Sequence, residues 1–168
     1  MGRYDDALAD LQGSLKIKLR YAGDDRRNIA FTYLYLSICY GEKGDYDKSL
    51  LYGQEYLSIT KKMYGETHFQ TGNAYGRMGS ILSKPSKNDF SSALEYLHKA
   101  ILILEGSLGK HHADTASAYT NLGITYSNAK RHEQSISAFK EALTIRLAVY
   151  DSNHPVVAEA YNNLGTAY

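Results

Sequence analysis

The amino-acid sequence repeats with a period of 42 residues, lengthened to 44 at one step, along the whole chain. One block of the repeat carries a tyrosine four times, at Tyr33, Tyr75, Tyr119 and Tyr161. A second block, which precedes each of these, carries an aliphatic residue four times, at Leu8, Leu50, Leu94 and Ile136. Self-similarity at a fixed period of roughly 20–50 residues is typical of repeat arrays such as solenoids and propellers. The period therefore constrains the fold more than any other feature.

Both blocks have the spacing of amphipathic helices. In the Leu8 block, which we call helix B, leucines recur three and four residues apart and so share one face. The tyrosine block, helix A, has the same kind of face. Glycines follow the B helices at Gly23, Gly65 and Gly109, where a helix end can need a positive φ. The expected helices span 2–22, 27–43, 45–63, 68–84, 88–108, 112–129, 131–150 and 154–168.

The pattern predicts an all-α fold. We expect a right-handed α-solenoid of antiparallel helix pairs, a superhelix of about seven or eight helices. Residues 1–168 are expected to form a single array with helix pairs at about 2–43, 45–84, 88–129 and 131–168, each in the order B then A. Neither end carries a polar capping helix, so we expect the chain to be a fragment of a longer array, or its ends to be covered.

Small residues mark the middle of each pair. One column of helix A holds Ser37, Gly79, Gly123 and Gly165. A glycine inside a helix costs about 1 kcal/mol relative to alanine, so a packing reason is needed. Small residues on helix B, at Ala7, Ser49, Ala93 and Ser135, predict that the two helices approach each other closely at this column.

The combined pattern resembles the tetratricopeptide repeat. Its signature is present as Tyr119, Leu122-Gly123, Tyr126, Ser135 and Phe139. The 42-residue period and the segment HPVVAEAYNNLGTAY are similar to the kinesin light chain class of these repeats. The resemblance implies a protein-interaction scaffold that is not an enzyme and holds a peptide or partner protein in a concave groove lined by A helices.

The residues of helix A that do not face helix B are the candidate groove residues. In the first A helix they include Phe31 and Leu34, and the groove is expected to be aromatic at this end and amide-rich at the other. Asparagine can donate and accept, so an asparagine ladder could pair with a peptide backbone, and Arg77 could bind a carboxylate. The alternative is that the asparagines only satisfy turns and solvent. The predicted groove residues are Tyr35, Ile38, Asn73, Arg77, Thr120, Asn121, Asn128, Asn162 and Asn163.

Other chemistry is not expected. The net charge of +1 gives no argument for nucleic acid or an anionic membrane, and no stretch is long and apolar enough for membrane insertion. We predict no catalytic residues, cofactor or metal. His68, His112 and His154 recur once per repeat, and we expect them to form hydrogen bonds at helix starts. The single cysteine, Cys39, fits a reducing compartment, so a cytoplasmic location is expected.

Two alternatives to an independent scaffold stay open. The repeats could be a regulatory or sensor module of a larger signalling enzyme, which flanking sequence would reveal. They could also assemble with themselves, because the last A helix lacks a B partner and the first B helix lacks an A partner. Such head-to-tail self-association through uncapped ends would not close on itself.

Overall fold

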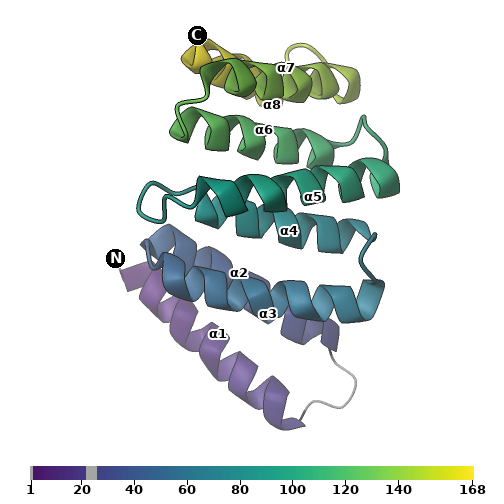
Figure 1. Ribbon diagram of the computed structural model, residues 1–168. Helices are drawn as coiled ribbons and strands as arrows, with labels where there is room; N and C mark the ends of the chain where they lie inside the picture. Colours follow the sequence, from purple (N-terminus) through teal and green to yellow (C-terminus); the bar gives the residue numbers. More distant parts are fainter. Residues whose placement is uncertain (1, 22–25) are drawn as a thin grey trace. The chain divides into compact units, whose positions relative to one another are not determined.

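The structure, a computed structural model, describes residues 2–21 and 26–168 of the chain. This part of the chain contains eight α-helices (Figure 1). Each helix starts and ends within two residues of the expected position, and the predicted all-α class with paired helices is confirmed. Gly23 lies outside the described residues. The helices are α1 (Gly2–Tyr21), α2 (Arg26–Lys43), α3 (Tyr46–Tyr64), α4 (Phe69–Leu82), α5 (Phe90–Leu108), α6 (Ala113–Asn128), α7 (His132–Val149) and α8 (Pro155–Ala167).

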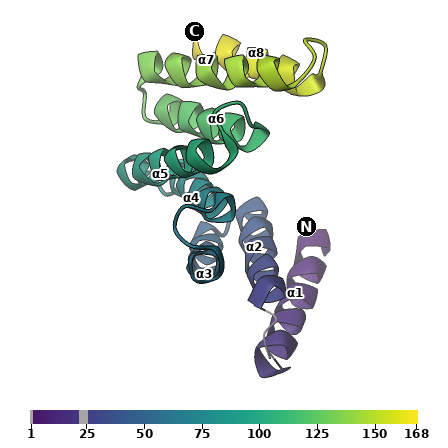
Figure 2. The same cartoon turned by 90° about the vertical axis from the view of Figure 1, so that its right-hand side faces the viewer.

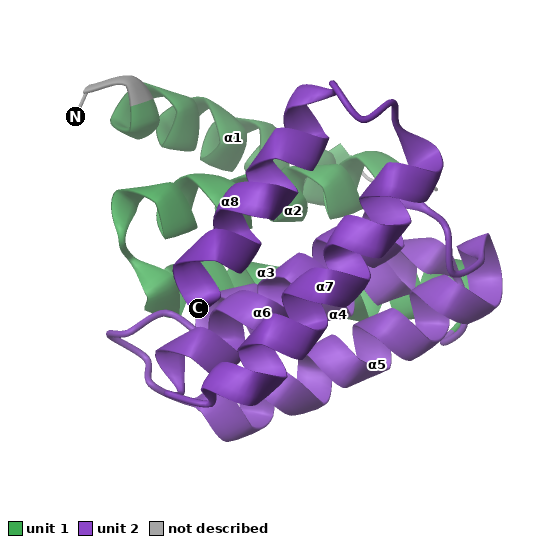
Figure 3. Cartoon of the chain, turned by 90° about the horizontal axis from the view of Figure 1, so that it is seen from above, with its two compact units in different colours: residues 1–65 green, residues 66–168 purple. Residues whose placement is uncertain are grey.

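The helices form two compact units, residues 1–65 and 66–168 (Figure 3). In unit 1, α2 packs between α1 and α3 (Figure 2). In unit 2, α4 pairs with α5 and α6 with α7, while α8 packs against α7. The A helices of unit 2 also touch one another, α4 against α6 and α6 against α8. That residues 1–168 form a single array stays a prediction.

Each unit has its own apolar core. In unit 1 the buried cluster joins α1 to α2 through Leu8, Leu15, Ile29, Leu36 and Tyr40. In unit 2 the cluster spans α5, α6 and α7, and it contains Leu94, Leu97, Ile101, Leu104, Ala118, Leu122 and Ala138. Since no helix pair could bury these faces alone, each hairpin depends on its neighbour for stability.

The small-residue column brings helices A and B into close contact, as predicted. A Cβ on Gly79 would lie 2.6 Å from Leu97 Cγ and 2.9 Å from the Ala93 carbonyl oxygen. In unit 1 the same column holds serines: Ser37 Oγ donates to the Ser49 carbonyl at 2.8 Å, and Ser49 Oγ donates to the Ser37 carbonyl at 2.7 Å. Glycine and serine are both small, so neither side chain holds the two helices apart.

The turns are built from local hydrogen bonds. His68, His112 and His154 cap α4, α6 and α8, each accepting a backbone N–H at its Nδ1, over 3.2, 3.1 and 3.2 Å. This confirms the predicted hydrogen bonding at helix starts. Gly65 and Gly109, at the ends of α3 and α5, have φ values of 91° and 88°, as expected.

Candidate functional site

The predicted aromatic end of the groove lies on α2. Tyr35 is 53% exposed and Phe31 is 37% exposed, so both rings are partly open to solvent. Ile38, one helical turn from Tyr35, is half-buried. The two exposed rings border a hollow of about 330 Å³ between α1 and α2, with Leu11, Ser14, Lys18, Asn28 and Thr32 as the remaining lining residues.

A lysine is fixed inside this hollow. Lys18 Nζ donates to Thr32 Oγ1 at 2.8 Å and lies 3.4 Å from the carbonyl oxygen of Asn28. Its alkyl stem comes from α1, while both acceptors belong to α2. The hollow of unit 1 therefore combines two aromatic rings with one positively charged group held by neutral oxygens.

Two of the predicted asparagines join helices together. Asn73 Nδ2 on α4 donates to Asp114 Oδ2 on α6 at 2.9 Å. Asn128 Nδ2, near the end of α6, donates to the carbonyl of Ser83 just beyond α4, at 3.1 Å. These two bonds tie one A helix to the next, whereas the alternative that the sequence left open was bonding to turns and solvent.

Thr120 is buried. Its side chain is 7% exposed, and its hydroxyl donates to the Ala116 carbonyl one turn earlier, at 3.0 Å. The repeat explains why: Thr120 shares a column with Gly76, whose Cβ position lies 3.7 Å from Ala100 on α5. This column faces helix B, so Thr120 presents no open surface. Asn162, in the same column on α8, is exposed.

The remaining predicted residues form one column of the repeat. Arg77, Asn121 and Asn163 stand at equivalent positions on α4, α6 and α8, and all three are half-buried. Since α4 touches α6 and α6 touches α8, the column runs across three neighbouring helices of unit 2. Whether these three side chains bind a ligand stays a prediction.

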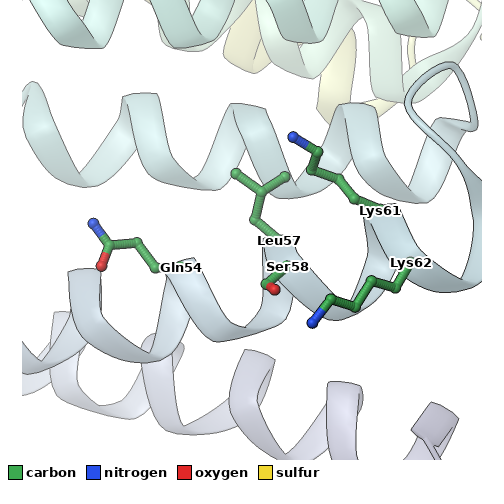
Figure 4. A pocket seen from close by; sticks show the side chains of 5 residues that line it. All are labelled: Gln54, Leu57, Ser58, Lys61 and Lys62. Atoms are coloured by element: carbon green, nitrogen blue, oxygen red, sulfur yellow. The ribbon is translucent and has the colours of Figure 1, made fainter.

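Sequence reasoning missed a hollow of about 310 Å³ on α3. It is lined by Gln54, Leu57, Ser58, Lys61 and Lys62 (Figure 4). The side chains of Leu57 and Lys61 point to the same side of the helix (Figure 4). The available signal was a lysine pair beside a leucine on a B helix, whereas the predicted groove residues all lie on A helices.

Comparison with known families decides the identity of the repeat. The profile described as "Tetratricopeptide repeat" matches residues 1–62, 70–148 and 125–168. The chain belongs to the tetratricopeptide repeat family. Tetratricopeptide repeats are generally protein–protein interaction modules, which agrees with the coarse functional prediction. A comparison with curated proteins gave no match.

Solved structures share the fold of this tetratricopeptide repeat chain. The crystal structure of BtubC (BKLC) from P. vanneervenii is 21% identical with a TM-score of 0.84; the alignment covers 99% of this chain and 66% of that one. The crystal structure of a Podosopora anserina putative kinesin light chain with nearly identical TPR-like repeats is 15% identical with a TM-score of 0.78, covering 99% and 78%. The neighbours are kinesin-light-chain-like repeat proteins, as the resemblance implied.

No described helix of the tetratricopeptide repeats combines the length and apolar composition that crossing a bilayer requires. Nor do the described residues contain a group of three or more histidine, cysteine or acidic side chains that could hold a metal ion. Three surface features stand out: the hollow between α1 and α2, the α3 hollow, and the column of Arg77, Asn121 and Asn163 in unit 2.

Proposed function

We propose that this chain is a protein-interaction scaffold that holds a peptide or a partner protein on the surface of its A helices, with the hollow between α1 and α2 as the main anchoring point. The observation that carries the proposal is the exposure of Phe31 and Tyr35 beside a hollow of about 330 Å³. Large aromatic residues at the centre of an interface contribute a disproportionate share of binding energy. A ligand side chain placed between these rings would remove apolar surface from water.

Lys18 indicates what the ligand should carry. Its ammonium is bonded to two neutral oxygens, so a carboxylate that approached it would find a charge that is not already neutralised there. A leucine or aromatic residue followed by an aspartate or glutamate would satisfy both features of the hollow. Within unit 2, the amides of Asn121 and Asn163, with Arg77, support contacts to the backbone and a carboxylate of a bound peptide.

A peptide array tests this proposal. The full chain is applied to peptides that pair leucine, phenylalanine or tyrosine with acidic residues, and to the same peptides with the acidic residues amidated. The double variant Phe31→Ala/Tyr35→Ala should lose most of the signal. Leu51→Ala is the matched control, because Leu51 is 54% exposed in the same unit but lies on α3. Equal signals from all three proteins would refute the role of the hollow.

The polar column has its own comparison. The triple variant Arg77→Ala/Asn121→Ala/Asn163→Ala should weaken peptides whose backbone or carboxylate contacts this column of unit 2. Unchanged binding of every peptide would leave these three side chains without a binding role. A regulatory module of a larger signalling enzyme would use the same surface, and a cytoplasmic location remains a prediction for either role.

A further inference from the structure

A third hollow lies in unit 2, between α6 and α7. Its volume is about 200 Å³. α6 contributes two rings and an aliphatic side chain, and α7 contributes polar groups; the residues that matter are Tyr119, Leu122, Tyr126, Gln134, Ser137 and Glu141. Tyr119 and Tyr126 face α5 as well, since their hydroxyls meet Glu105 and His98 there. The hollow therefore has an aromatic floor and a polar wall.

The carboxylate of Glu141 stands in this wall, and its ionic partner Lys110 is poorly aligned with it. Glu141 Oε2 is buried and accepts no hydrogen bond, and it is the one buried side-chain oxygen or nitrogen of that kind within residues 2–21 and 26–168. Lys110 Nζ lies 3.0 Å from it, which makes an ion pair, but the angles do not meet those of a hydrogen bond. The Glu141 side chain as a whole is 42% exposed, so a ligand can reach its carboxylate, and a well-aligned charged donor would bond to Oε2 more strongly than the misaligned ammonium does.

The charges around the hollow favour a cation. Tyr119 Oη donates to Glu105 Oε1 at 3.0 Å. Burial, this bond to Glu105, and the nearby charge of Glu141 raise the pKa of Tyr119 to about 12. The hydroxyl thus lies in a field set by two carboxylates, one on α5 and one on α7. Lys110 opposes this field, but its side chain is 53% exposed and can move into solvent.

Size decides what kind of cation fits. Pockets for small molecules usually measure about 300–1,000 Å³, so a hollow of about 200 Å³ suits one side chain of a larger partner. A guanidinium is planar, stacks on aromatic rings and carries several fixed N–H donors, whereas an ammonium is compact and strongly hydrated. The aromatic floor and the carboxylate wall match the guanidinium better.

We propose that the hollow between α6 and α7 binds an arginine side chain of a partner protein, whose guanidinium stacks over the Tyr119 ring and donates a hydrogen bond to Glu141 Oε2. This surface is separate from the one proposed above. It uses the B-helix side of unit 2, whereas Phe31, Tyr35 and Lys18 belong to unit 1. The chain would then hold partners at two places with opposite charge preferences.

An NMR titration of the full chain tests the proposal. The probe is N-acetyl-arginine amide, and the matched control is N-acetyl-citrulline amide, which has nearly the same shape without the charge. The arginine probe should give saturable shifts of the amide signals of Tyr119, Ser137 and Glu141. The citrulline probe should bind at least about fivefold more weakly, because it lacks the charge-assisted bond.

Two variants change the affinity in opposite directions. Glu141→Gln should weaken the arginine probe by about fivefold or more, while Lys110→Met should strengthen it by about two- to threefold by removing a competing cation. Glu55→Gln, with the same charge change on α3, should leave the affinity unchanged. The proposal is overturned by an arginine probe that does not saturate, by equal binding of citrulline, or by a Lys110→Met protein that binds no more tightly than the wild type.

Discussion

The ring of Phe139 on α7 closes directly over Gly123 on α6: a Cβ on Gly123 would lie 2.7 Å from the ring atoms Cδ1 and Cε1. Phe139 is 4% exposed, so its ring cannot swing out into solvent. Ser135 Oγ also donates to the Gly123 carbonyl at 2.9 Å. The two helices are therefore held together at a distance that only glycine allows at this position.

Gly123→Ala should consequently destabilise the protein. Alanine has the better helix propensity by about 1 kcal/mol, but forcing a methyl group into a closed contact costs about 1–3 kcal/mol. We expect the free energy of unfolding to fall by up to about 2 kcal/mol, as measured by urea denaturation followed by circular dichroism. Gly165→Ala is the internal control: its Cβ position is open, so this variant should be neutral or more stable.

The turn before each B helix offers a stabilising change. Gly44, Asn88 and Lys130 stand in one column, and their φ values are 85°, 52° and 60°. A lysine with a positive φ is strained, while glycine adopts it without cost. Lys130→Gly should raise the urea midpoint, corresponding to a gain of about 0.5–1 kcal/mol. Gly44→Ala should lower the urea midpoint. A lower urea midpoint in both variants would contradict the argument.

The next residue in the turn gives a separate test. Asp45 and Asp89 cap α3 and α5 by accepting the backbone N–H of Lys48 and Ser92, at 3.2 and 3.1 Å. Arg131, at the same place before α7, makes no side-chain capping bond. Arg131→Asp should therefore stabilise the protein by about 0.5–1 kcal/mol, measured as thermal and urea midpoints. Arg131→Ala removes the positive charge without adding a cap, so it separates the two effects. Its unfolding midpoints should differ little from those of the wild type.

Features that repeat could be predicted from the sequence, because each repeat checks the others. The column of Ser37, Gly79 and Gly123 was expected to allow close packing, and Leu97, Phe139 and Ser49 fill that space in the structure. The histidine caps were predicted in the same way. In both cases the same kind of residue recurs at the same place in the repeat, so the spacing indicates the structural role of that residue.

Contacts that do not repeat could not be predicted. The bond from Asn73 to Asp114 needs both partners, and the equivalent pair in the next repeat is Ser117 and Val156. Thr120 was placed on the open face because helical spacing alone gives a side chain's direction only to within a fraction of a turn. The buried Glu141 Oε2 depends on the packing of α6 against α7, for which the sequence carries no signal.

Acid stability should depend on Asp45. Its hydrogen bonds to the Lys48 side chain and backbone hold the pKa of this carboxyl below its usual value, and Lys48 Nζ lies 2.9 Å away. A carboxyl with a lowered pKa in the folded state adds stability above its unfolded pKa of about 3.9, and this is lost as the pH falls through the folded value. Asp45→Asn, which keeps a capping group, should flatten the fall in stability below about pH 4.

The control for Asp45 separates the cap from the ion pair. Lys48→Met removes the ammonium but leaves the carboxylate as a cap, so it should flatten the same part of the pH profile to a smaller extent. Urea midpoints measured at a series of acidic pH values give both profiles. Parallel profiles for the wild type and Asp45→Asn would show that the carboxyl does not contribute.

Alkaline stability should depend on Tyr56, which is 3% exposed on α3. Burial, with a smaller contribution from the charge of Tyr64, raises the pKa of Tyr56 to about 12, whereas the unfolded chain releases this proton near pH 10. Because the folded state keeps the proton longer, the contribution of Tyr56 is fully present below about pH 10 and is lost as the pH rises towards about 12. Tyr56→Phe should therefore reduce the loss of stability across this range, measured as urea midpoints at successive alkaline pH values. Tyr35→Phe changes an exposed ring and serves as the control. If both variants lose stability with pH as steeply as the wild type, the ionisation of Tyr56 does not govern alkaline unfolding.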